Sequence, residues 1–182
     1  GTIAIGQSAL TALTSGAGNV AVGYDAMATN KLGDKNIAIG YGAMDLSYID
    51  DTQDALTDNN IFIGYDSGGG DWATAASYGN VAIGNLTMDG ILNGATDNTA
   101  VGHNAMSTLL EGDKNICIGK NAGNHDVNMT NGYGNIIIGA DADVSTASAT
   151  NQIVIGRDCS GVADNSVTLG NADVTAVYMA QD

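Results

Sequence analysis

A short apolar phrase closed by glycine recurs along the whole chain, and this repetition limits the fold more than any other feature. The steps between successive phrase-closing glycines are 17, 17, 24, 20, 18, 17, 20, 17 and 14 residues. A near-constant period, with insertions only between the phrases, is typical of a solenoid in which every repeat forms one coil. We therefore predict an all-β parallel β-solenoid of about ten coils. The glycines are Gly6, Gly23, Gly40, Gly64, Gly84, Gly102, Gly119, Gly139, Gly156 and Gly170.

Each unit reads as two short strands joined by tight turns, because a β-branched run is followed by glycine and then by a second short stretch. The aliphatic residues one and three positions before the glycine, such as Ile37 and Ile39, share one face and are expected to fill the coil. The glycine is expected to turn the chain with a positive φ, and the asparagines that open the phrase to form a ladder between coils. Residues four positions after the glycine are expected to close the core: Leu10, Met27, Met44, Met88 and Met106.

The residue two positions before each glycine indicates whether copies of the chain associate. This position is apolar in nearly every unit, so we expect the strands to be buried on both faces. Stacked coils would then present an apolar stripe roughly 45 Å tall, which soluble monomers rarely leave exposed. Another copy of the chain is the simplest cover; three copies would suit the small alanines, but the pattern does not separate three from two. The predicted interface residues are Ala21, Ala38, Phe62, Ala82, Ala100, Cys117, Ile137 and Val154.

Charge excludes several classes of partner. The chain carries 5 Lys+Arg against 20 Asp+Glu, a formal net charge of −15. Nucleic acid is therefore a poor partner, because its binding requires cationic groups that displace counterions, and anionic membrane surfaces are disfavoured for the same reason. No apolar run approaches the length of a membrane-spanning helix, so we predict no membrane insertion.

Two phrases near the end, "NQIVIG" (151–156) and "NSVTLG" (165–170), resemble the N-S-V-A-I-G phrase of trimeric autotransporter adhesin heads. The longer units, such as "NIAIGYGAM" (36–44), are similar to repeats in bacteriophage tail fibres and tailspikes. The segment "VTLGNADVTAVYMAQD" (167–182) resembles the stretch just before the self-cleaving C-terminal chaperone of endosialidase-type phage fibres. The resemblance implies a left-handed β-roll, an intertwined or side-by-side homotrimer, and attachment to a cell surface. Most units depart from the adhesin pattern by carrying Asn four rather than five positions before the glycine.

We accordingly divide the chain into a repeat domain, 1–170, and a connector, 171–182, that precedes a chaperone removed by cleavage. Three insertions exceed the basic period, at 45–59, 66–79 and 124–134. Insertions in solenoids emerge as loops on one side and often bind ligands.

The insertions carry aromatic and acidic residues that are typical of sugar sites, where a ring packs on the apolar face of a pyranose. The alternative is that these rings only anchor their own loops. The acidic residues of the first insertion also suit calcium, but the spacing of a calcium-binding loop is missing, and we expect no cofactor. The predicted glycan-binding residues are Tyr48, Asp50, Asp51, Asp54, Trp72, Tyr78, His125 and Tyr133.

The expected function is a non-catalytic segment of a phage tail fibre that lies on the virion and binds bacterial surface polysaccharide or lipopolysaccharide. His103 and His125 lie in separate units, and no Ser/His/Asp set has an arguable spacing. The alternatives are a trimeric adhesin head on the bacterial outer surface and a purely structural fibre shaft. A tailspike that cleaves polysaccharide would need carboxylates converging on a groove.

Overall fold

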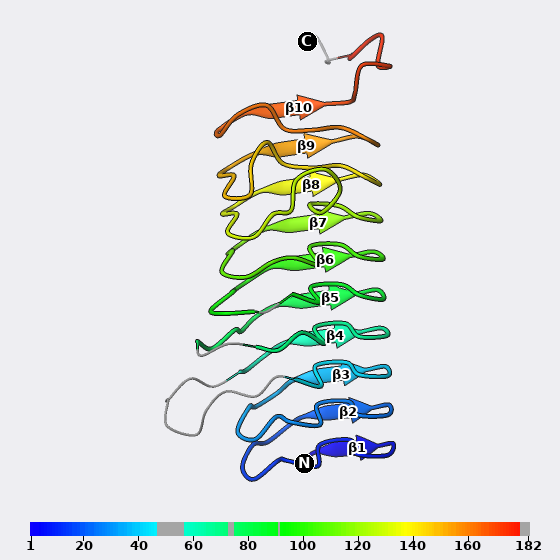
Figure 1. The fold of residues 1–182 in the computed structure, drawn as a ribbon, viewed down its shortest axis with the longest axis vertical. Helices are drawn as coiled ribbons and strands as arrows, with labels where there is room; N and C mark the ends of the chain where they lie inside the picture. Colours follow the sequence, from blue (N-terminus) through cyan, green and yellow to red (C-terminus); the bar gives the residue numbers. More distant parts are fainter. Residues whose placement is uncertain (47–56, 73–74, 91, 179–182) are drawn as a thin grey trace.

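The computed structural model describes residues 1–46, 57–72, 75–90 and 92–178. These residues form ten parallel strands in one sheet, and the order of the strands in the sheet is their order in the sequence (Figure 1). The prediction of an all-β parallel β-solenoid is confirmed. Within the described ranges no helix is long and apolar enough to cross a membrane. The strands are β1 (Ile3–Ile5), β2 (Val20–Val22), β3 (Ile37–Ile39), β4 (Ile61–Ile63), β5 (Val81–Ile83), β6 (Thr99–Val101), β7 (Ile116–Ile118), β8 (Ile136–Ile138), β9 (Ile153–Ile155) and β10 (Val167–Leu169).

Equivalent residues of successive phrases pair in register. Ala38 lies opposite Phe62 although 24 residues separate them, and Ala100 lies opposite Cys117 at the basic period of 17. The insertions therefore leave the stacking of the strands unchanged. In the sequence, every extra residue falls between two strands.

The prediction of two strands in each unit is wrong. The described part of each coil contains one three-residue strand, and the stretch after the glycine is a series of turns. The reason is visible in the backbone: Asp25 and Met27, two and four positions after Gly23, have φ values of 55° and 52°. A strand cannot continue through residues in the left-handed region.

The predicted orientation of the strands is also wrong. The middle residues, which were assigned to the surface between chains, are fully buried within a single chain; the flanking aliphatics, such as Ile37 and Ile39, point outward. This corrects the interface assignment of all eight predicted residues, each of which has no exposed surface: Ala21, Ala38, Phe62, Ala82, Ala100, Cys117, Ile137 and Val154.

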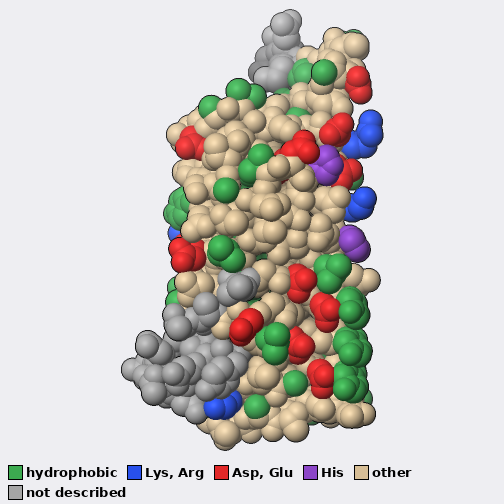
Figure 2. All heavy atoms as spheres, viewed as in Figure 1, with side chains coloured by type: hydrophobic (Ala, Val, Ile, Leu, Met, Phe, Trp, Pro, Cys, Tyr) green, Lys and Arg blue, Asp and Glu red, His purple; other side chains and the backbone are tan. Residues whose placement is uncertain are grey.

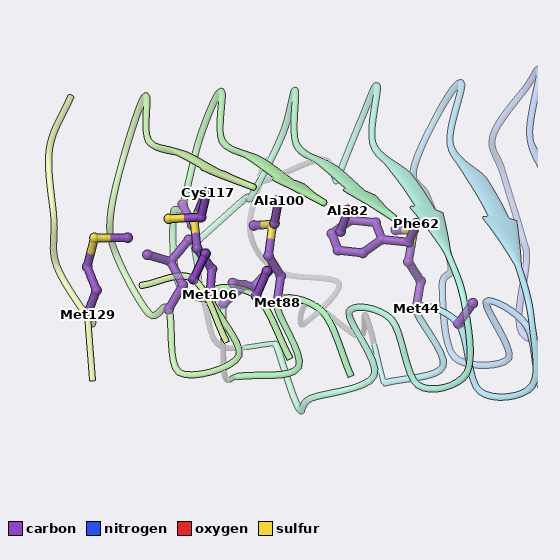
Figure 3. Packing of buried hydrophobic residues seen from close by; sticks show 14 of the residues in the cluster. Met44, Phe62, Ala82, Met88, Ala100, Met106, Cys117 and Met129 are labelled. Carbon is purple, nitrogen blue, oxygen red and sulfur yellow. The ribbon is translucent and has the colours of Figure 1, made fainter. Parts of the chain in front are cut away.

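The reason for this orientation is the width of the coil. The residues four positions after the glycine are buried as predicted, and Figure 3 shows the Met44, Met88 and Met106 side chains lying inside the coil opposite the strands. Their long side chains fill most of the interior, so a small residue such as Ala82 or Ala100 fits beneath the strand. Protein interiors are close-packed, and two isoleucines per strand would not fit in the same space.

A ladder of asparagines runs through the interior, as predicted. The backbone N–H and the side-chain amide of Asn115 both donate to Asn98 Oδ1, at 3.0 Å each. The Asn98 amide in turn donates to Asn80 Oδ1 at 3.0 Å and to the Gly112 carbonyl at 2.7 Å. The same bonds repeat from Asn19 to Asn135, and Gln152 ends the ladder, so the coils from β2 to β9 are joined by buried polar contacts.

The phrase-closing glycines turn the chain with positive φ, which confirms their predicted role. Gly102 has a φ of 139°, and a Cβ at this position would lie 2.5 Å from the carbonyl oxygen of Gly119 in the next coil. Glycine is required here for two reasons, the backbone conformation and the close approach of a neighbouring coil.

Candidate functional site

The outward side chains of the ten strands form an apolar stripe along the whole solenoid, which we call the strand-face stripe. It consists of the first and last residue of each strand from β1 to β10, and all but Thr99 are Ile, Val or Leu. Ile83, Ile118 and Ile155 are 41%, 39% and 41% exposed. Nine coil steps of about 4.8 Å and strands about 10 Å long give an area on the order of 400 Å². Patches of this size are the largest that soluble proteins carry, and they are often functional.

The predicted glycan residues of the first insertion, Tyr48, Asp50, Asp51 and Asp54, lie outside the described residues. Trp72 of the second insertion is buried, and its indole N–H donates to the Gly68 carbonyl at 2.9 Å. Its ring packs edge-on against Phe62, with 5.5 Å between the ring centroids. The prediction that Trp72 binds a ligand is therefore wrong, because its ring is part of the core.

Tyr78 and Tyr133, from the second and third insertions, lie on one column of the solenoid. Isolated parallel bridges join Tyr78 to Thr96, Thr96 to Asp113 and Asp113 to Tyr133. Both tyrosines are about half exposed. Three coil steps separate them, which corresponds to about 14 Å. We call these four residues the tyrosine column.

Polar groups in the column and next to it are held in place by hydrogen bonds. Asp113 Oδ1 accepts from the backbone N–H of Thr96 at 2.8 Å and from its hydroxyl at 2.7 Å. The Lys114 ammonium donates to the Tyr133 hydroxyl at 3.4 Å and lies 5.5 Å from the centre of that ring. The bond to Tyr133 raises the pKa of Lys114, so this side chain stays charged at neutral pH.

A second polar group lies beside the column on the same coils. Glu111 accepts from the amide of Asn93 at 2.9 Å through Oε1, and from the amide of Asn131 at 3.1 Å through Oε2. In the sequence, the buried Gly112 separates Glu111 from Asp113, and the buried Gly132 separates Asn131 from Tyr133. Glu111 lies two positions before Asp113 on the same coil.

His125 is exposed and lies on a segment of the third insertion that is fixed by a buried carboxylate. Asp143 Oδ2 accepts from the backbone N–H groups of His125, Asp126 and Val127, at 3.2, 2.7 and 2.6 Å. Burial raises the pKa of Asp143, and these bonds act in the opposite direction. The His125 ring has a carboxylate oxygen of Asp126 at 3.5 Å. Asp143 therefore anchors the insertion, which sequence reasoning did not identify.

Three tyrosines that follow the glycine of successive units stack in a ladder near one end of the strands. The ring centroids of Tyr24 and Tyr41 are 4.9 Å apart, and those of Tyr41 and Tyr65 are 5.6 Å apart, with nearly parallel planes. Figure 2 shows a row of hydrophobic side chains along one long edge in this part of the molecule. Since the tyrosines stack on one another, the faces of Tyr41 are occupied, which favours a packing role over sugar stacking.

Carboxylates gather close to this ladder. Burial, followed by the charges of Asp66 and Asp25, raises the pKa of Asp45 to about 6. Burial and the charges of Asp66 and Asp45 raise the pKa of Asp89 to about 6. Asp45 Oδ1 is buried and accepts no hydrogen bond within the described part of the chain. The described ranges contain no group of three or more His, Cys, Asp or Glu side chains arranged to hold a metal ion.

Thr96 and Asp113 of the column, and Lys114 beside it, were missed by sequence reasoning. Each lies one or two positions before the asparagine of its phrase. Aligning the units on that asparagine, rather than on the glycine alone, would have placed Thr96 and Asp113 in one column with the two tyrosines and Lys114 next to it.

Comparison with protein-family models, with curated proteins and with solved structures gave no match.

Proposed function

We propose that the chain is a non-catalytic fibre segment, of the kind found in phage tail fibres, that self-associates through the strand-face stripe and attaches to a glycan on the bacterial surface. The observation that carries the proposal is the stripe. Exposed apolar residues on soluble proteins are normally scattered singly, whereas here the outward strand positions are aliphatic without interruption apart from Thr99 of β6.

The occupant that fits best is a second copy of the same chain. An identical stripe has the same length and the same spacing of coils, so aliphatic side chains would meet aliphatic side chains along the full height. The resemblance to trimeric adhesin heads and phage fibres favours three copies. The alanine argument for three no longer applies, because the alanines lie inside the coil.

Sedimentation velocity tests the association. We expect the wild-type chain to sediment as a trimer, and the double variant Ile83→Asp/Ile118→Asp to sediment as a monomer, because two carboxylates would be buried without partners. Val162→Asp is the matched control, since Val162 is 77% exposed and lies between β9 and β10, outside the strands. A wild-type protein that stays monomeric at all concentrations would refute self-association.

Binding to intact bacteria, with soluble surface polysaccharide as competitor, tests attachment. We expect the assembled protein to bind cells of a susceptible host and the polysaccharide to displace it. Binding to a matrix protein instead would support the adhesin alternative, and release of reducing sugar would support a cleaving tailspike. An assembled protein that binds no cell or polysaccharide would refute attachment and leave a structural shaft.

A further inference from the structure

Resting on the proposed attachment function, we propose that the tyrosine column is the glycan site and that its ligand is an uncharged linear oligosaccharide lying parallel to the solenoid axis. The column joins two residues from different insertions, Tyr78 and Tyr133, through Thr96 and Asp113. Neither ring is part of the core, in contrast to Trp72, since both are about half exposed.

The spacing of the rings sets the length of the ligand. Tyr78 and Tyr133 are three coil steps apart, about 14 Å. A single pyranose cannot contact both rings, whereas a chain of several units can place one sugar on each. Aromatic rings contribute to sugar binding by packing against the apolar face of the pyranose. The site therefore selects an oligosaccharide over a monosaccharide.

Hydroxyl groups between the two rings would find partners that are already oriented. Asp113 uses Oδ1 for Thr96, and its Oδ2 accepts no hydrogen bond within the described residues. The Lys114 ammonium has three N–H groups, one of which donates to Tyr133. Glu111 is held by the amides of two neighbouring coils. Groups fixed in this way lose little conformational entropy on binding, which favours affinity.

The charge around the column favours an uncharged ligand. Asp113 belongs to the column, Glu111 lies two positions before it, and Asp97 lies one position after Thr96. The cation beside these three carboxylates is Lys114, which the charges of Asp97 and Asp113 reach. An acidic sugar would meet net negative charge here, in a chain whose formal net charge is −15. An uncharged oligosaccharide can donate hydrogen bonds to the carboxylates and accept one from the Lys114 ammonium without this repulsion.

An array of uncharged and acidic bacterial oligosaccharides, followed by titration calorimetry with the best ligand and its shorter fragments, tests the proposal. We expect binding to uncharged chains that weakens sharply when the chain becomes too short to reach both rings. Tyr78→Ala/Tyr133→Ala should weaken binding at least about tenfold. The matched control is Tyr41→Ala, which removes a similarly exposed ring from the other tyrosine ladder and should bind as the wild type does. Lys114→Ala, a milder change beside the column, should weaken binding less than the double variant.

The outcomes separate this proposal from the attachment function. If the wild type binds cells but binds only acidic glycans, or if the double variant binds as tightly as the wild type, the tyrosine column is not the site and attachment stands. If the wild type binds neither cells nor any glycan on the array, attachment itself is refuted, and this proposal with it. Equal thermal midpoints for the variants and the wild type exclude loss of folding as the cause of weaker binding.

Discussion

The asparagine ladder should contribute far more to stability than any polar contact on the surface, and Asn98→Ala measures this contribution. The substitution removes four buried hydrogen bonds: two that Asn98 Oδ1 accepts from Asn115, and two that its amide donates to Asn80 and Gly112. At about 1 kcal/mol for each bond, the expected cost is about 4 kcal/mol. The backbone N–H of Asn115 would also be left buried without its acceptor, which places the cost at the upper end for a single substitution.

Asn131→Ala is the matched control. Asn131 is an exposed asparagine whose amide donates one bond, at 3.1 Å, to Glu111. Its loss should cost less than about 1 kcal/mol.

Urea unfolding followed by circular dichroism gives the free energy of unfolding for both variants. The protomer concentration must be the same throughout, because association links stability to concentration. If the two variants differ by less than about 1 kcal/mol at equal m-values, the ladder has no special weight and this reasoning is wrong.

Three further predictions concern charge, backbone and thiol chemistry. The pKa of Asp45 in the folded chain is about 6, above its unfolded value, so the folded state binds more protons and stability falls as pH rises from about 4 to about 6. After allowance for solvent screening, Asp45→Asn should raise the free energy of unfolding in urea by about 1 kcal/mol at pH 7 and leave it unchanged below pH 4. Gly102→Ala should lower the free energy of unfolding by more than about 3 kcal/mol in the same assay, because its Cβ would lie 2.5 Å from the Gly119 carbonyl oxygen. Gly134→Ala is the control: a Cβ there would meet no atom within 4 Å, and the expected cost is about 1 kcal/mol. Cys117 is fully buried, and burial raises the pKa of its thiol, so a thiol-specific reagent should label it in urea and leave it unlabelled in buffer. Rapid labelling in buffer would contradict this burial.

The number of coils, the register and the asparagine ladder could be predicted from the sequence because each depends only on the period. The turns after the glycine could not. Met27 adopts a φ of 52° although methionine has no preference for that region. Tertiary stacking imposes this conformation: the Met27 N–H donates to the carbonyl of Ala43 in the next coil at 2.9 Å. The intrinsic backbone preference of methionine cannot reveal such a contact between coils.

The candidate site was predicted in part. Tyr78 and Tyr133 were identified as exposed aromatics of the insertions, and the structure brings them onto one column. Trp72 was assigned to the surface with them, but it packs on Phe62. A signal for this existed: Phe62 is the one large aromatic among middle residues that are elsewhere Ala, Cys, Ile, Val or Thr. A coil widened by such a ring needs further apolar volume, and the insertion that follows supplies it.

The reversed strand faces have the same origin. A run of three apolar letters is symmetric with respect to the two faces of a strand, so periodicity cannot say which face lies inside. Side-chain volume can: with a methionine such as Met88 filling the coil from the opposite side, the space beneath the strand admits Ala82 and excludes Ile83. The expectation that a second molecule covers the strands depended only on both faces being apolar. It therefore transfers from the middle residues to the flanking ones, and it becomes stronger, because the flanking residues are the larger and present more apolar surface to water.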